Sequence, residues 1–216
     1  MEVLEGVTVP SHDLEKYLQR LATHAGGGVI LSTCNRMEIY SVTEDVAIGI
    51  NQLKEYIETT SKSSRATNID QYIYTLNGDA VAEHLFSVAA GLDSIALGES
   101  EITGQVTKAL QAAGEAGTID PSLSRMFHAA LRTSRRIRKE TALGRNRISI
   151  SSLGVKELQN IVGDLSGLHV LLVGAGETGR LTANALRRYG ADEIVVSSRS
   201  FERGSVLAEE LGSSQV

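Results

Sequence analysis

The only cysteine of this 216-residue chain lies in a short polar stretch that could support nucleophilic chemistry. The stretch reads Thr33-Cys34-Asn35-Arg36 and follows an apolar run, so a tight turn at the end of a strand would present the thiol outward. A thiolate attacks carbonyl carbons, and a neighbouring arginine lowers the pKa of a thiol by stabilising its charged form. Thr33 and Asn35 offer a hydroxyl and an amide that can position a carbonyl group. The alternative is a buried structural cysteine, because free cysteine is among the residue types most often buried.

A second chemically suggestive stretch is the glycine-rich turn VGAGETG, residues 173–179. It has the pattern G-x-G-x-x-G and lies between an apolar strand and a helix. Glycines in this pattern allow a tight turn, close approach of a pyrophosphate and close packing of helix on strand. The alternative is a glycine-rich turn that binds nothing. The predicted cofactor-binding residues of the turn are Gly174, Ala175, Gly176, Glu177, Thr178 and Gly179.

The end of the next predicted strand indicates which dinucleotide would bind. NAD-specific folds carry an acidic residue there, which binds the ribose 2′-hydroxyl. Here the residues are Ser198, Arg199 and Ser200, with no carboxylate among them. Arg199 can pair with a 2′-phosphate and stack on adenine, which favours NADPH over NADH. The alternative is a solvated loop arginine.

A cysteine nucleophile combined with NADPH suggests reduction of a thioester. The thiolate accepts an acyl group, a hydride converts the thioester to a thiohemiacetal, and collapse of that species releases an aldehyde. This combination favours the nucleophile over the structural interpretation of Cys34.

Hydrophobic spacing predicts the elements that must position these residues. The first part of the chain should begin with a helix capped by Ser11, with Leu14, Tyr17, Leu18 and Leu21 on one face, followed by strands over 29–32 and 37–42. Next we expect a helix with Val46, Ile50, Leu53 and Ile57 on one face, a polar loop over 59–68 and a strand over 71–76.

The rest of this part should be helical. A helix from Asp79 carries Val81, Leu85 and Val88, residues 91–105 interrupt the pattern, a helix with Ile102, Val106, Ala109 and Ala113 follows, and a last helix begins at Asp120-Pro121.

The second part of the chain reads as strand, helix, strand and helix. The strands are expected over 169–173 and 193–197, and the first helix over 177–188. We therefore predict an α/β fold overall, with an α+β catalytic domain over 1–144, a linker helix over 145–166, and the first β-α-β-α part of a Rossmann-type NADPH-binding domain over 167–216. Such a sheet usually has about six strands, so we expect further chain beyond these residues.

Composition excludes several classes of protein. The formal net charge is −5, so contact with nucleic acid would need a local basic patch. Aromatic residues make up 4% of the chain and there is no Trp, which disfavours base-stacking platforms. No apolar run approaches the roughly 18 residues of a membrane span, and no metal site is predicted. A single cysteine and a polar, acidic beginning favour a cytoplasmic protein.

Taken together, the motifs resemble those of the glutamyl-tRNA reductase family, over nearly the whole chain. The first two pieces are the most specific. The stretches that carry the resemblance are STCNRMEIY (32–40), EHLFSVAAGLDSIALGESEITGQV (83–106), RRIRKET (135–141), ISISSLGVKEL (148–158), VGAGETG (173–179) and SSRSFERGSVLAEEL (197–211).

The resemblance implies a reaction and a set of roles. Glutamyl-tRNA(Glu) would be reduced with NADPH to glutamate-1-semialdehyde, the first step of five-carbon tetrapyrrole synthesis, and tRNA would be released. Cys34 matches the family's nucleophile, and His84 matches a histidine that exchanges a proton with the leaving ribose hydroxyl. Arg36 gains a second candidate role, as the partner of the substrate's side-chain carboxylate. Read without the resemblance, His84 would be a capping or core histidine. The positions that match the substrate pocket are Thr33, Asn35, Arg36, Ser94, Glu99 and Gln105.

The resemblance also implies partners. The family forms homodimers, and the unstable aldehyde makes glutamate-1-semialdehyde aminomutase a reasonable receiving partner. The family's opening strand with its G-x-x-H-x-x-A-P-V stretch is missing here, as is its helical dimerisation domain. We therefore expect this chain to lack the family's dimer interface, to acylate Cys34 weakly and to reduce the thioester poorly.

One basic stretch has two interpretations. Arg132, Arg135, Arg136 and Lys139 follow helical spacing on one face. They could contact tRNA phosphates, or they could form a solvated face with no partner.

Two other functions remain as alternatives. A shikimate-dehydrogenase-like NADP oxidoreductase would share the cofactor part, but would need a Lys–Asp pair in place of the TCNR stretch. A non-catalytic tRNA-binding paralogue would keep the fold without the reaction.

Overall fold

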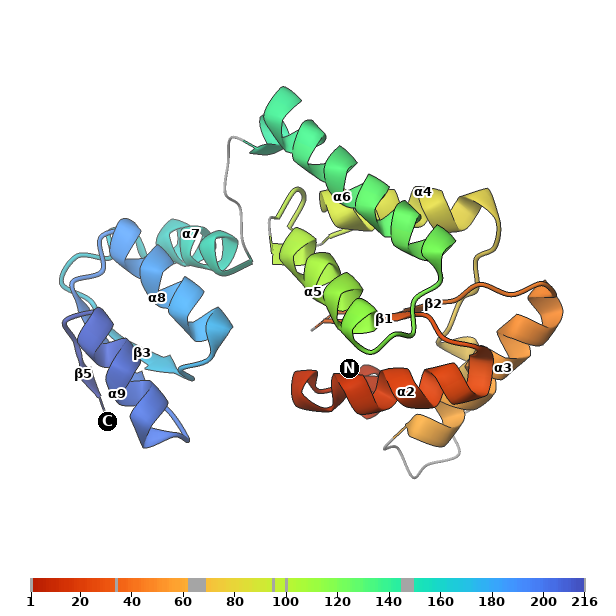
Figure 1. Cartoon of the computed structure of the whole chain (residues 1–216). Helices are drawn as coiled ribbons and strands as arrows, with labels where there is room; N and C mark the ends of the chain where they lie inside the picture. The colour runs from red at the N-terminus through yellow and green to blue at the C-terminus, as the bar shows by residue number, and fades with distance from the viewer. Residues whose placement is uncertain are drawn as a thin grey trace. The chain divides into compact units, whose positions relative to one another are not determined.

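The computed structural model describes residues 2–33, 35–61, 69–94, 96–99, 101–144 and 150–215. The fold is mixed α/β, mostly helical with two small sheets in the described part (Figure 1). It divides into two compact units, one formed by residues 1–94 with 100–146 and the other by 95–99 with 147–216. Each unit has its own hydrophobic core.

The first unit is built around an antiparallel hairpin. Strand β1 (Val29–Ser32) pairs with β2 (Met37–Tyr40), with Leu31 opposite Glu38. Both strands were predicted and both are confirmed. Gly28 precedes β1 with a φ of 154°, and a Cβ there would overlap the carbonyl oxygen of Tyr40. Only glycine therefore lets the chain enter β1 this close to the end of β2.

Helices surround this hairpin. They are α1 (Glu2–Val7), α2 (Leu14–Ala25), α3 (Val46–Thr60), α4 (Asp79–Ala90), α5 (Glu101–Glu115) and α6 (Pro121–Glu140), with short 3-10 turns at Ser11–Asp13, Ile69–Gln71 and Ala142–Gly144. The predicted apolar faces are largely those that are buried, which confirms the helical spacing of α2, α4 and α5. The fully buried side chains of this core include Leu18, Leu21, Leu85, Val88, Val106 and Phe127.

Helices α4, α5 and α6 meet at a small buried polar cluster at the carboxyl end of α4. The hydroxyls of Thr103 and Ser134 both donate to the carbonyl oxygen of Ala89, at 2.9 and 2.7 Å. Arg138 donates to the Ala90 carbonyl and to the Thr103 hydroxyl. The last carbonyls of a helix have no partner within the helix, so these side chains satisfy them and fix where residues 91–94 leave α4.

Three predictions about local structure are wrong. Residues 71–76 form no strand, because no described strand pairs with them and Tyr72, Tyr74 and Leu76 are exposed. Alternating apolar residues make a strand only where a neighbour supplies ladder hydrogen bonds. Ser11 does not cap α2, since Ser11–Asp13 form a 3-10 turn and the helix begins at Leu14. Val46 is exposed although it was placed on the apolar face of α3, where Tyr56 is buried instead.

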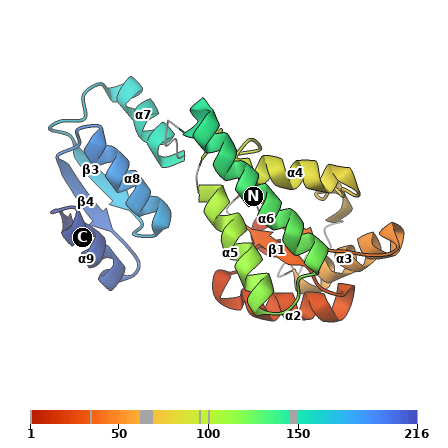
Figure 2. The ribbon, with the colours of Figure 1, turned by 45° about the horizontal axis from the view of Figure 1, so that its top comes forward.

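The second unit has a parallel sheet. Strands β3 (His169–Val173), β4 (Glu193–Ser197) and β5 (Ser214–Gln215) lie in the order β3-β4-β5. Helix α8 (Glu177–Arg188) connects β3 to β4, α9 (Phe201–Glu210) connects β4 to β5, and α7 (Ile150–Val162) packs beside α8 (Figure 2).

The predicted strands β3 and β4 are confirmed, and the short β5 was not predicted. Three strands are fewer than the six or so of a full dinucleotide-binding sheet, so the Rossmann-type assignment stays a prediction. Within the described ranges, no helix combines the length and the apolar character that crossing a bilayer requires.

Candidate functional site

The hairpin turn of the first unit is organised by Thr33. Its backbone N–H donates to the carbonyl of Arg36 at 2.9 Å, which closes the loop between β1 and β2. Its hydroxyl oxygen accepts the backbone N–H groups of Asn35 and Arg36, at 3.2 and 3.1 Å. Thr33 therefore shapes the turn. Cys34, the predicted nucleophile, lies outside the described residues.

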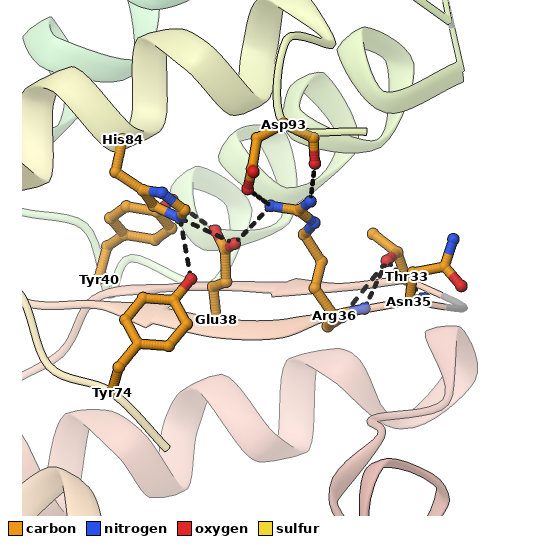
Figure 3. Close-up of polar contacts among 8 residues, drawn as sticks. All are labelled: Thr33, Asn35, Arg36, Glu38, Tyr40, Tyr74, His84 and Asp93. Carbon is orange, nitrogen blue, oxygen red and sulfur yellow. Dashed lines mark hydrogen bonds and ion pairs between the residues drawn. The ribbon is translucent and has the colours of Figure 1, made fainter. Parts of the chain in front are cut away.

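Arg36 is held on two sides by carboxylates. Its Nη1 donates to Glu38 Oε1 at 3.0 Å and to Asp93 Oδ2 at 2.8 Å, and its Nη2 donates to the Asp93 carbonyl oxygen (Figure 3). Burial acts to lower the pKa of the guanidinium, but the bonds to Asp93 and Glu38 outweigh it, so the pKa is raised. Arg36 is a permanent cation that links the hairpin to the segment after α4.

Glu38 is the centre of the network. Its side chain is 10% exposed, and Oε1 contacts both Arg36 Nη1 and His84 Nε2, each at 3.0 Å. Its Oε2 accepts the hydroxyl of Tyr40 at 2.5 Å. Side chains on a strand alternate between faces, so Arg36, Glu38 and Tyr40 project from the same face of the hairpin. The nearly buried Glu38 carboxylate thus contacts three side chains, those of Arg36, Tyr40 and His84.

His84 reaches this carboxylate from α4. An ionised carboxylate only accepts hydrogen bonds, so His84 must donate from Nε2. A neutral His84 ring therefore carries its proton on Nε2. Nδ1 is then the ring atom that can accept a proton. Tyr74 lies at the edge of the ring, with centroids 5.9 Å apart and an interplanar angle of 83°, and its hydroxyl is 3.3 Å from Nε2. Together Glu38 and Tyr74 fix the orientation of the imidazole.

Two tyrosine hydroxyls of the network have raised pKa values. Burial is the main cause at Tyr40, and the charge of Glu38 adds to it. Burial also comes first at Tyr74, again with Glu38 adding to the effect. Both hydroxyls are therefore neutral near pH 7.

The remaining predicted substrate residues lie in different places. Asn35 is exposed, and Figure 3 shows its amide directed away from Arg36. Ser94 is half-buried and directly follows Asp93. Glu99 belongs to the second unit. Gln105 lies within α5 and donates to Glu101 Oε1 at 3.3 Å. Thus Arg36 and His84 come together, joined by Glu38, while no described hydrogen bond joins Gln105 to them.

The predicted phosphate-binding turn joins β3 to α8 in the second unit. Gly174 has a φ of 111° and donates its N–H to the Ser197 carbonyl at 2.7 Å. A Cβ at Gly179 would overlap the carbonyl oxygen of Gly174, so the helix can approach the turn only with glycine there. Around Gly176 the space is open.

The turn borders a hollow of about 400 Å³. The hollow is lined by Ala175, Gly176, Glu177, Arg180, Glu202, Arg203 and Val206. Beyond β4, Arg199 is exposed, and the hydroxyl of Ser200 accepts the backbone N–H of Arg203 at the start of α9. Ser200 is therefore occupied as a helix cap, which leaves Ser198 and Arg199 as the more available side chains.

Sequence reasoning missed four residues of the network. They are Glu38, Tyr40, Tyr74 and Asp93. A signal for the first two was available: Arg36, Glu38 and Tyr40 alternate along the second strand of a hairpin whose first strand is apolar except for Ser32, so their face was expected to be partly buried. A charged side chain on such a face needs an ionic partner.

The chain is similar to known proteins. Residues 1–141 match the family described as Glutamyl-tRNAGlu reductase, N-terminal domain, and residues 156–216 match Shikimate / quinate 5-dehydrogenase. A glutamyl-tRNA reductase of Desulfitobacterium hafniense is 36% identical over 212 residues, which are 97% of this chain and 48% of that protein. One from Pseudomonas fluorescens is 38% identical over 220 residues, covering 100% of this chain and 50% of the relative.

A solved structure is also similar. The glutamyl-tRNA reductase from Methanopyrus kandleri matches with a TM-score of 0.61 at 31% identity, over 100% of this chain and 50% of that one. The chain thus spans about half the length of these relatives. Since the family match covers residues 1–141 and similar relatives extend it to nearly the whole chain, this chain belongs to the glutamyl-tRNA reductase family.

Proposed function

We propose that this chain supplies the acyl-accepting and cofactor-binding parts of an NADPH-dependent glutamyl-tRNA reductase. The reaction would convert glutamyl-tRNA(Glu) to glutamate-1-semialdehyde and free tRNA, at the start of tetrapyrrole synthesis. The observation that carries the proposal is the carboxylate of Glu38, shared by Arg36 and His84, next to the turn whose sequence contains Cys34. Glu38 thereby holds Arg36, the proposed partner of the substrate's carboxylate, close to His84, the proposed proton carrier.

Arg36 would bind the side-chain carboxylate of the glutamyl group. Of its five N–H donors, three are used by Glu38 and Asp93. The Nε–H and the second Nη2–H have no partner among the described residues. These two donors lie along one edge of the guanidinium plane, and such an edge binds a carboxylate through two parallel hydrogen bonds.

Cys34 would take the acyl group. Its thiolate attacks the ester carbonyl, a carbon–sulfur bond forms, and the bond between the acyl carbon and the ribose oxygen breaks. The ribose oxygen leaves as a hydroxyl and needs a proton. His84 would exchange that proton at Nδ1, because its Nε2 is bound to Glu38.

The second unit fits a dinucleotide. Gly174 and Gly176 would leave room for a pyrophosphate at the N-terminus of α8, Gly179 lets that helix approach the turn, and Arg199 would pair with a 2′-phosphate. When bound, reduced nicotinamide supplies a hydride for the reduction of the thioester.

The partners follow from the same proposal. Glutamyl-tRNA(Glu) is the substrate, and an aminomutase acting on glutamate-1-semialdehyde is the proposed receiver of the aldehyde. The single cysteine suits a reducing, cytoplasmic compartment.

Transfer of labelled glutamate tests the proposal. The chain is incubated with tRNA charged with radiolabelled glutamate, without NADPH, and the protein is analysed after denaturation. We expect weak label on the wild-type chain that hydroxylamine releases, no label on Cys34→Ser, and slow conversion of the label to aldehyde when NADPH is added. Equal labelling of wild type and Cys34→Ser would contradict the proposal.

The match of residues 156–216 to Shikimate / quinate 5-dehydrogenase favours a second candidate, an NADP oxidoreductase acting on a small alcohol. In that case Cys34→Ser would leave NADP-dependent turnover of shikimate intact and no glutamyl label would be captured. The same two proteins therefore separate the candidates.

A further inference from the structure

Helix α6 has a strongly basic exposed face, which the proposed reaction does not use. At about 100° per residue, Arg125, Arg132, Arg135, Arg136 and Lys139 fall within an arc of about 100°. All five are exposed. The opposite side of the helix is its core face, with Phe127, Leu131 and Ser134 among its buried residues. We call these five residues the basic face of α6.

Few negative charges balance the positive charges of the basic face. The only acidic residue in α6 is Glu140, which lies 3.8 Å from Arg136 with both side chains mostly exposed. Such a pair contributes little and is easily exchanged. In the described part of the chain, Arg132, Arg135 and Lys139 form no ion pair. A chain with a net charge of −5 thus concentrates free positive charge along one helix.

The same face is hollowed between its arginines. A depression of about 300 Å³ is lined by Ala129, Arg132, Thr133 and Arg136. Ala129 and Thr133 have small side chains and line the same depression as Arg132 and Arg136, so an anion can enter it. Arginine binds phosphate through two parallel N–H donors, which suits this arrangement.

The composition of the face selects the class of partner. None of the exposed large hydrophobic side chains in the described structure lies on α6. Protein interfaces and membrane-surface helices need an apolar centre, whereas contacts to a nucleic-acid backbone need only spaced cations. Arg132, Arg135 and Lys139 lie about one turn, or roughly 5 Å, apart along the helix.

We propose that the basic face of α6 docks the sugar–phosphate backbone of an RNA. On the proposed function, that RNA is the tRNA which carries the glutamyl group. The face would hold the RNA by charge alone, without reading its sequence.

The salt dependence of RNA binding tests the proposal. The 216-residue chain is titrated with uncharged tRNA between about 50 and 200 mM salt. The variant is Arg132→Gln/Arg135→Gln/Lys139→Gln. We expect weaker binding and a slope of log K against log salt that is smaller by about 2 to 3, since each lost phosphate contact removes about 0.7 to 0.9.

A matched control removes the same charge elsewhere on the first unit. Lys16→Gln/Arg20→Gln/Lys108→Gln replaces three exposed cations with the same side chain. It should bind tRNA with the wild-type slope, and circular dichroism should show equal helix content in all three proteins. Equal weakening by both triple variants would overturn the proposal, because the overall field would then be responsible.

Three further outcomes are informative. If the wild type acquires glutamyl label on Cys34 while the α6 variant binds tRNA as the wild type does, the docking proposal fails and the proposed function stands. If the wild type neither binds tRNA nor acquires label, both fail. Competition by polyglutamate as strong as that by an RNA homopolymer of equal charge would indicate an acidic protein partner and overturn the choice of RNA.

Discussion

Glu38 determines the arrangement of the charged residues near the TCNR turn. Its carboxylate is nearly buried and accepts hydrogen bonds from Arg36, Tyr40 and His84. Hydrogen bonds to a charged group contribute about 1.5 to 3 kcal/mol each, more than bonds between neutral groups. Without this anion, Arg36 would keep only Asp93, and His84 would lose the acceptor that fixes its tautomer.

We predict that Glu38→Gln slows transfer of glutamate to Cys34 by about 10- to 100-fold. The amide keeps the shape of the side chain but removes its charge, and a loss of about 1.4 to 2.7 kcal/mol in transition-state stabilisation corresponds to that range. The rate of labelling from charged tRNA measures the effect.

Tyr40→Phe provides the matched control for this prediction. It removes one hydrogen bond to Oε2 but leaves the charge of Glu38 beside Arg36 and His84. We expect labelling within a few-fold of wild type. A Glu38→Gln protein that labels as fast as Tyr40→Phe would show that the charge is not needed.

At this scale the sequence predicts the residues that resemble known chemistry and misses the ones that support them. The sequence predicts roles for Arg36 and His84, but their proximity is visible only in the fold, since 48 positions separate them. Glu38 was not singled out from the sequence. Its burial depends on α4, which lies far along the chain.

At the scale of elements, the carboxyl end of α4 positions the segment that contains Asp93. The buried Ser134 hydroxyl donates to the Ala89 carbonyl at 2.7 Å and lies 3.2 Å from the Thr103 hydroxyl. These contacts tie α4 to α5 and α6 just before the chain turns back towards Arg36. Their loss would loosen the turn that presents Asp93.

We predict that Ser134→Ala lowers the free energy of unfolding by about 1 kcal/mol, since it removes one of the two hydroxyls that donate to the Ala89 carbonyl. Urea denaturation measures it. Ser124→Ala, a half-buried serine in the same helix with no described side-chain hydrogen bond, is the control and should change stability by less than about 0.5 kcal/mol. Equal effects would contradict the role of the cluster.

Elements with strong periodicity were predictable, and those that depend on a distant partner were not. The faces of α2 and α5 follow directly from the spacing of Leu18, Leu21, Ile102 and Val106. Residues 71–76 have the alternation of a strand, but Tyr74 contacts His84 instead of joining a sheet. Periodicity reports which side of a segment is apolar, and it does not report whether a neighbour exists.

At the scale of the whole molecule, buried tyrosines make stability depend on alkaline pH. Burial raises the pKa of Tyr56 to about 12, and its hydroxyl donates to the Tyr17 carbonyl at 2.8 Å. Above a pH of about 10 the unfolded chain loses this proton while the folded protein keeps it. The free energy of unfolding therefore falls as pH rises, by about 1.4 kcal/mol per pH unit for this group up to about pH 12.

We predict that Tyr56→Phe is less stable than wild type near pH 8 and that the difference shrinks between about pH 10 and 12. Urea denaturation at a series of pH values measures it. Tyr72→Phe, at an exposed position, should follow the wild-type curve. Parallel curves for wild type and Tyr56→Phe would contradict the prediction.

The hydrogen bond from the Gly174 N–H to the Ser197 carbonyl links the ends of two adjacent strands. Ser197 immediately precedes the residues proposed to choose between the two nicotinamide dinucleotides. Substitutions at positions 198–200 that aim to change that choice therefore lie next to the hydrogen bond that holds the glycine-rich turn, which is the proposed binding site of the diphosphate. Substitutions that change the cofactor preference should therefore be combined with substitutions near position 174. Without them, we expect the change in preference to come with weaker binding of the dinucleotide.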